Sequence, residues 1–250
     1  MKKSNPIILA LLSLAFINCK TEKHQFPIEK RYWDTEDYNK VTLELNYGYE
    51  SDERLPSFDD PETRVIVQKL TDHENYKIVL DDEELGIRFK NEVAETFFKE
   101  WKGMTDIYDA TDRKDKFLYD KELLAVWHFG LGLQLKYFKL GNDQIIENAD
   151  DPSAKQVQRR LNSNINTLIK NYLIYIDKVN NEKAFSEEGK SKLAEGIDTY
   201  YTALIELYPD ADYGEMKKKA ELLIKKSKSD RIKSSLNALI ELINSKEHKE

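Results

Sequence analysis

The chain has few residues that break helices and almost no cysteine. Its 250 residues include 9 glycines, 6 prolines and one cysteine. Average proteins hold roughly 12% glycine plus proline, about twice the share found here. The scarcity rules out collagen-like and linker-rich chains, and it disfavours an all-β sandwich, which needs a turn every 8–12 residues or so. Long helices fit the composition best, and a single cysteine leaves no disulfide within the chain.

Signatures of common catalytic sites are also missing. The sequence contains no GxSxG, GxxxxGK[ST] or GxGxxG segment, and none of its 4 histidines stands in an HExxH pair. Acids recur at every third position in one row, but the spacing lacks the alternating order, central glycine and final glutamate of a calcium-binding EF-hand loop: Asp106, Asp109, Asp112 and Asp115. We therefore predict no metal and no cofactor.

Basic residues are outnumbered, with 39 lysines and arginines against 46 aspartates and glutamates, a net charge of −7. This balance argues against nucleic acid as a partner and against electrostatic adhesion to anionic lipid. A protein partner, if there is one, is expected to be basic, because an acidic surface steers basic proteins toward it.

The first residues have the pattern of a secretory signal. Two lysines follow Met1, and an apolar run from Ile7 to Ile17 is too short to span a bilayer, which takes about 20 residues. The run ends in Phe-Ile-Asn-Cys, with the lone cysteine at position 19. This ending resembles the lipobox of bacterial lipoproteins, in the relaxed form typical of Bacteroidetes. The resemblance implies cleavage before Cys19, diacylglycerol on its thiol, acylation (palmitate or a similar chain) of the new amine, and anchorage in the cell envelope, facing the periplasm.

Three parts follow from these features. Residues 1–18 are a lipoprotein signal peptide, residues 19–31 are the lipidated cysteine and a polar tether, and residues 32–250 form a single α-helical domain. Inner or outer membrane, surface exposure and oligomeric state stay open.

Helical periodicity is clear beyond residue 80. Apolar residues recur at three- and four-residue steps, with caps and stops between them, over 81–104, 120–140, 152–179, 186–208, 213–224 and 232–243. Asp120 and Ser186 are predicted N-caps, and Gly141 and Pro209 predicted stops. The last three segments are joined by short turns and should pack as antiparallel neighbours. The fold class is mainly α, a helical bundle of about six to eight helices.

Residues 32–80 allow two interpretations. Val41, Leu43, Leu45, Tyr47 and Tyr49 alternate as in a strand, which suggests a small β-hairpin near the N-terminus. A helical stripe of Tyr38, Val41 and Leu45, opened by Asp34-Thr35, explains the same residues. Asp60-Pro61 indicates a helix from Pro61 to about Leu70, and Tyr76 to Leu80 is left open.

Two sets of residues are candidates for a site. His128 falls on the apolar face of its helix, where it is either a weak candidate for a general base or a core histidine bonded to a carbonyl or a tyrosine hydroxyl. A group of aromatic residues lies near the N-terminus among acids, as on a surface that binds a basic protein or a sugar, or as the core face of a helix or hairpin: Tyr32, Trp33, Tyr38, Tyr47 and Tyr49. Gly130 and Gly132 are expected to let a neighbouring helix approach closely.

The function that the sequence favours is that of a lipid-anchored, non-catalytic binding protein of the cell envelope. Its most concrete form is an immunity protein or inhibitor of a toxin or lytic enzyme. An accessory subunit of an envelope or uptake complex is the first alternative, and a hydrolase that uses scattered carboxylates with His128 is the second.

Overall fold

The computed structural model describes the backbone of residues 26–50, 54–109, 117–147, 150 and 152–247. Within these ranges the chain is mainly α, as predicted, and has no strand. The α-helices are α2 (Thr35–Glu50), α3 (Arg64–Leu70), α4 (Glu74–Leu80), α5 (Ile87–Tyr108), α6 (Asp120–Glu147), α7 (Pro152–Ile176), α8 (Glu187–Gly196), α9 (Thr202–Leu207), α10 (Gly214–Lys226) and α11 (Asp230–Glu247). A 3₁₀ segment, η1 (Asp177–Ala184), follows α7, and a π segment, η2 (Ile197–Tyr201), joins α8 to α9.

The N-terminal segment is a helix, so the predicted β-hairpin is wrong. One carboxylate oxygen of Asp34 accepts hydrogen bonds from the backbone N–H groups of Glu36 and Asp37, both at 2.9 Å, and so opens α2. The alternating pattern fails because Leu43 and Tyr47 are 63% and 60% exposed, while the residues at helical spacing are buried: Tyr38, Val41 and Leu45. The helical interpretation of this stretch is therefore confirmed.

Helices α3 and α4 are short and are joined to α2 through one buried amide. Asn75 accepts a hydrogen bond from the backbone N–H of Trp33 at 2.9 Å and donates one to the hydroxyl of Tyr38 at 2.8 Å. The predicted start at Pro61 is a turn, and α3 begins at Arg64. The open stretch from Tyr76 to Leu80 belongs to α4.

Helix α6 runs through the middle of the molecule and continues past its predicted stop. Gly141 is helical, since no described glycine has a positive φ. A Cβ at this position would lie 2.8 Å from a methyl of Leu161 on α7, so the glycine serves close packing between the two helices rather than termination. Asp120 stands at the start of α6, as predicted, and its Oδ1 atom accepts a hydrogen bond from the backbone N–H of Lys121 at 2.8 Å. Its Oδ2 atom also accepts from the backbone N–H (2.6 Å) and hydroxyl (2.8 Å) of Ser186, which caps α8.

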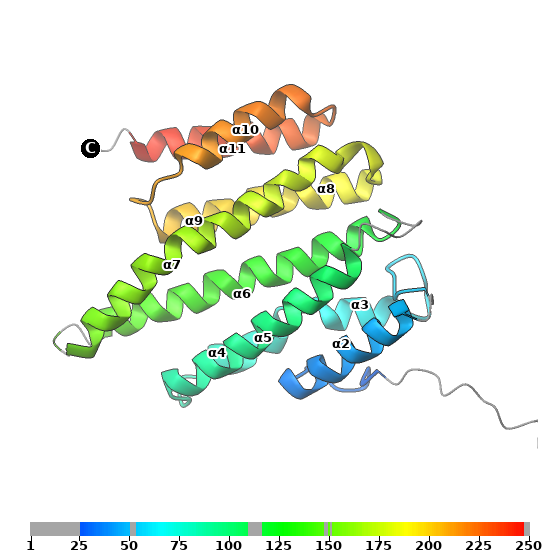
Figure 1. The fold of residues 1–250 in the computed structure, drawn as a ribbon, viewed down its shortest axis with the longest axis horizontal. Coiled ribbons are helices and arrows are strands. Elements are labelled where there is room, and N and C mark those ends of the chain that lie inside the picture. Colours follow the sequence, from blue (N-terminus) through cyan, green and yellow to red (C-terminus); the bar gives the residue numbers. More distant parts are fainter. Residues whose placement is uncertain (1–25, 51–53, 110–116, 148–149, 151, 248–250) are drawn as a thin grey trace, which may run out of the picture.

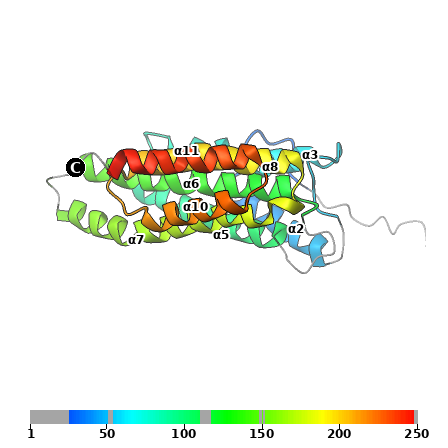
Figure 2. The ribbon, with the colours of Figure 1, turned by 90° about the horizontal axis from the view of Figure 1, so that it is seen from above.

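The helices lie side by side in a fan (Figure 1). Helix α2 packs on α5, α5 on α6, and α6 on α7 and α8. Of the antiparallel pair α10–α11, α11 packs on α8 and α10 on α7 and η1. Seen from above, the molecule is long and narrow, with the helix axes along its length (Figure 2). In the part of the chain that the structure describes, no helix is both long enough and apolar enough to cross a membrane.

Candidate functional site

A groove of about 700 Å³ lies between α5 and α7, and α6 forms its floor. This opening exists because α5 and α7 both pack on α6. Its apolar lining consists of Phe98 and Trp101 from α5, Trp127, Tyr137 and Phe138 from α6, and Leu168 and Ile174 from α7. Its polar lining consists of Lys102, Thr105, Asp106, Asp109, Gln134, Asn164, Thr167 and Asn171. A concave, largely aromatic surface with a few placed polar groups is the usual composition of a ligand site.

Two tryptophans dominate the groove. The rings of Trp101 and Trp127 meet edge to face with centroids 5.4 Å apart. A Cβ on Gly130 would fall inside the indole of Trp101, so the ring lies directly over the backbone of α6 at this glycine. This contact agrees with the expectation that Gly130 allows close approach. Both indole N–H groups are buried and have no acceptor among the described residues. Each such donor carries a desolvation cost of roughly 1–3 kcal/mol, which makes the pair unusual.

An ordered chain of amides crosses the groove from α7 to α6. Asn171 donates to the side-chain oxygen of Gln134 at 2.7 Å, and Gln134 donates to the carbonyl oxygen of Gly130 at 3.1 Å. Gln134 is 3% exposed, so its orientation is set by these two bonds. These two hydrogen bonds fix the orientation of the Asn171 side-chain amide.

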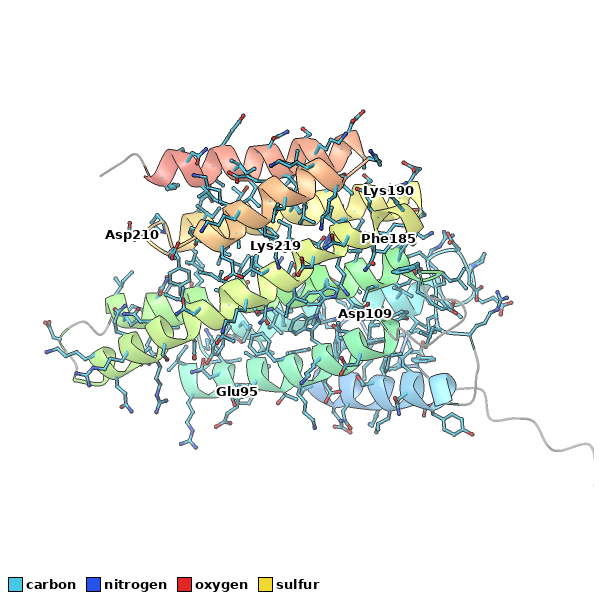
Figure 3. All side chains as sticks on the ribbon, turned by 45° about the horizontal axis from the view of Figure 1, so that its top comes forward. Glu95, Asp109, Phe185, Lys190, Asp210 and Lys219 are labelled. Carbon is cyan, nitrogen blue, oxygen red and sulfur yellow. The ribbon has the colours of Figure 1, made fainter. Side chains whose placement is uncertain are left out.

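The end of the groove near η1 carries a neutralised charge. The ammonium of Lys178 is paired with the carboxylate of Asp109 and lies 5.5 Å from the centre of the Trp127 ring. Asp109 sits near the end of α5 in Figure 3. Lys102 and Asp106, of opposite charge, also line the groove.

A second aromatic region, with polar groups, lies inside the molecule around His128. This His–Tyr cluster consists of His73, Tyr76, His128, Tyr175 and Tyr200. The Nε2 atom of His128 is 2.8 Å from the hydroxyl oxygen of Tyr175, and the Nδ1 atom of His73 is 2.8 Å from that of Tyr76. The ring of Tyr200, on the π segment, lies 5.2 Å from that of His128 and 6.2 Å from that of His73.

Both histidines are held in the neutral form. Burial lowers the pKa of His128 to about 3, with smaller contributions from Lys192 and His73. Burial also lowers the pKa of His73 to about 4, and Lys77 adds to the effect. The same burial raises the pKa of Tyr76, Tyr175 and Tyr200. The hydrogen-bond partners of both histidines in the described chain are tyrosine hydroxyls.

His128 is therefore a core histidine bonded to a tyrosine hydroxyl, the second of its two sequence interpretations. It is 7% exposed and does not line the groove. Close packing explains two glycines of this region as well. A Cβ on Gly132 would meet His73 and Tyr76, and one on Gly196 would overlap the hydroxyl of Tyr175 and the Nε2 atom of His128.

The structure separates the N-terminal aromatic candidates. Trp33 and Tyr38 are fully buried, where they hold α2 against its neighbours, so they are not available to a partner and their assignment to a binding surface is corrected. Tyr32 is half-buried beneath the guanidinium of Arg31, and Tyr47 is exposed. The side chain of Tyr49 lies outside the described residues, as does Cys19.

Acidic residues do not gather into a metal site in the described ranges: no group of three or more His, Cys, Asp or Glu side chains is placed to hold an ion. Of the acidic row, Asp106 and Asp109 line the groove, and Asp112 and Asp115 fall outside the described residues.

Sequence reasoning missed the groove, and of the His–Tyr cluster it singled out His128 alone. Trp101 and Trp127 belong to the apolar stripes of their helices, which predicts burial but not their meeting. A signal was present on α7, where Asn164, Thr167 and Asn171 stand at helical spacing beside the apolar stripe. Comparison of the chain with protein-family models, with curated proteins and with solved structures gives no match.

Proposed function

We propose that this protein is a lipid-anchored, non-catalytic binding protein of the cell envelope, and that its ligand occupies the groove between α5 and α7. The observation that carries the proposal is the groove itself: about 700 Å³, two tryptophans with unpaired indole N–H groups, and an ordered amide chain. The indole rings give the groove a flat aromatic surface, and the amides beside them supply hydrogen-bonding groups for a ligand.

A recessed site favours the accessory-subunit version of this function. An inhibitor must cover another protein's active site with a complementary surface, whereas a groove receives and holds a ligand. We therefore place the protein with an envelope or uptake complex, as the subunit that captures the ligand.

The groove is tested by blocking it. Thr167 is an exposed residue on the α7 wall, so Thr167→Trp should fill the groove without disturbing the core. Lys170→Trp introduces the same side chain on the same helix at an exposed position that does not line the groove, and serves as the matched control. Native mass spectrometry of protein purified from its own envelope should find a bound mass in the wild type and in the control but not in Thr167→Trp. Equal loading of all three proteins, or none in the wild type, would contradict the proposal.

Turnover separates binding from catalysis. Asp106 and Asp109 are the carboxylates in the groove, and Asp109 is engaged by Lys178. A captured ligand should be recovered chemically unchanged after long incubation. Release of cleaved fragments, lost in Asp106→Asn, would instead support the hydrolase alternative.

The anchor is tested separately. Replacement of Cys19 by alanine removes the thiol that carries the lipid, so the variant should move from the membrane fraction to the soluble fraction. Continued membrane retention would contradict lipid anchorage and leave the groove proposal untouched.

One observation favours the immunity-protein or inhibitor version as a second candidate. Leu43 and Tyr47 lie one turn apart on α2 and are both more than half exposed, which is the kind of apolar pair that a protein partner covers. Affinity purification of the wild type against the double variant Leu43→Lys, Tyr47→Lys addresses it. A basic toxin or lytic enzyme recovered in stoichiometric amount with the wild type alone would support inhibition through α2.

A further inference from the structure

The groove combines aromatic rings with polar groups. Phe98 and Trp101 of α5 line it beside four polar residues of the same helix: Lys102, Thr105, Asp106 and Asp109. On α7 an amide wall is formed by Asn164, Thr167 and Asn171, which repeat at steps of three and four residues and so share one face. At 1.5 Å per residue, this polar row extends about 10 Å along the groove, with Leu168 and Ile174 of the same helix beside it. A ligand that fits must present both apolar faces and hydrogen-bonding groups.

The polar groups of the groove are predominantly neutral. Gln134, Asn164, Thr167 and Asn171 carry no charge, Asp109 is neutralised by Lys178, and Lys102 and Asp106 offset each other. A charged ligand would find no matching excess of opposite charge, and its desolvation on entry would go uncompensated. The groove therefore matches an uncharged ligand.

The tryptophans supply a flat aromatic surface. The indole of Trp101 covers Gly130, so α6 supports the ring from below. The indole N–H groups of Trp101 and Trp127 are buried and have no acceptor in the described chain, so the rings contribute their aromatic surface to the groove.

From these features we infer that the groove binds a neutral oligosaccharide. A sugar ring has apolar C–H faces that pack on aromatic rings and hydroxyl edges that bond to amides, which matches the aromatic rings of α5 and α6 and the amide wall of α7. An acyl chain would make no use of the polar groups on α7 and would cover them without partners, at a cost for each. A partner helix satisfies its own backbone and would make no use of the amide row. The inference rests on the proposed function, because it names the ligand of the same groove.

The test measures binding of the full chain to hexasaccharides of glucose, mannose, galactose, xylose and N-acetylglucosamine, with hexamers of galacturonic acid and glucosamine as charged counterparts. Intrinsic tryptophan fluorescence reports binding directly, because Trp101 and Trp127 form the groove and the third tryptophan, Trp33, is buried elsewhere. At least one neutral hexamer should bind, and no charged hexamer should bind more tightly.

Variants on the amide wall connect binding to the groove. Asn164 is exposed and Asn171 is half-buried, so the double variant Asn164→Ala, Asn171→Ala should fold normally. It should weaken binding about 100-fold, about tenfold for each hydrogen bond lost. Asn237→Ala, on an exposed position of α11, makes the same change far along the chain and should bind like the wild type.

Three results would overturn the inference. They are the absence of binding to every neutral hexamer at millimolar concentration, tighter binding of a charged hexamer, and binding that the amide-wall variants leave unchanged. Selection from a decapeptide library provides the second arm. Peptides that bind in place of sugars, and that bind less tightly to the amide-wall variants, would show that the groove holds an extended peptide. In that case the saccharide inference fails and the proposed function stands.

Discussion

Helix α6 contributes to two aromatic regions that differ in whether their polar groups have hydrogen-bond partners. In the His–Tyr cluster, the hydroxyls of Tyr76 and Tyr175 meet histidine nitrogens at 2.8 Å. In the groove, one residue away along the chain, Trp127 and its neighbour Trp101 keep indole N–H groups without acceptors. Satisfied polar groups in a closed interior stabilise a fold, whereas each buried donor without an acceptor costs stability. The comparison therefore assigns stability to the cluster and makes the groove, the proposed ligand site, the less well satisfied of the two regions.

Acidification should lower the stability of the protein through the two histidines of the His–Tyr cluster rather than through the groove. The folded-state pKa values of His128 and His73, about 3 and about 4, lie below the ordinary value of 6.5. Below about pH 6.5 the two histidines therefore bind protons in the unfolded chain but not in the folded chain. As a result, the free energy of unfolding falls as the pH decreases toward these values. At pH 5 the loss is on the order of 2 kcal/mol for each histidine. Urea denaturation at pH 7.5 and pH 5 measures it.

The control for this acid effect is a pair of variants, His128→Gln and His73→Gln. Each should be less stable than the wild type at pH 7.5 and should remove about half of the difference between the two pH values. Stability that is the same at both pH values in the wild type would show that the histidines are not shielded from protons.

A glycine-to-alanine substitution in each region tests how rigidly the cluster and the groove are packed. Gly196→Ala directs a Cβ into the hydroxyl of Tyr175 and the Nε2 atom of His128, which are enclosed by the core. We expect a loss of about 3 kcal/mol. Gly130→Ala directs a Cβ into the indole of Trp101, which can turn into the groove, and the gain in helix propensity offsets part of the cost. A loss of about 1 kcal/mol is expected there. Equal losses in chemical denaturation would mean that the groove is as rigidly packed as the cluster.

Removal of one polar group from each region should give a smaller difference in the same direction. Tyr175→Phe removes the hydroxyl that lies 2.8 Å from the Nε2 atom of His128 and donates to the carbonyl oxygen of Leu193 at 3.2 Å, and it should cost about 2 kcal/mol. Asn171→Ala removes the donor to Gln134, but Gln134 lines the groove and the shorter side chain should let solvent reach the freed oxygen, so the cost should be under about 1 kcal/mol. Thermal unfolding of the two variants at neutral pH measures both losses of stability. A larger loss for Asn171→Ala than for Tyr175→Phe would contradict the prediction.

The smallest effect on stability is expected from Asn164→Ala. This side chain is exposed and makes no hydrogen bond within the described residues, so the free energy of unfolding should change by less than about 0.5 kcal/mol. Differential scanning calorimetry against the wild type measures it. A substantial loss would show that the amide wall supports the fold and is not reserved for a ligand.

Local patterns predicted most of the helices but not all of their ends. The stripe of Tyr38, Val41 and Leu45 indicated a helix, yet the same stretch also alternated, and only burial of the stripe against the rest of the bundle separates the two. Gly141 has the sequence pattern of a helix stop, but Leu161 of α7 packs where its side chain would be. In both cases the deciding neighbour belongs to another helix.

The candidate site was predicted less well than the fold, because its residues are distant along the chain. His73 and Tyr200 are 127 positions apart, and the hydrogen bond from Asn171 to Gln134 spans 37. A core position for His128 was one of two sequence interpretations, because its own helix places it on an apolar face. Nothing local distinguishes Trp101 from Phe97, a neighbour on the same stripe that is 1% exposed.

The amino-acid sequence by itself determined the mainly α class, the positions of most helices and several of the residues that begin or end them, such as Ser186 and Pro209. These features depend on contacts within one or two turns, which periodicity and capping chemistry encode directly. Only the tertiary structure decided that Trp33 and Tyr38 are buried, that two histidines are shielded from protons, and that α5 and α7 leave a groove over α6. Each of these depends on how separate helices pack, and a pattern confined to one helix does not contain that information.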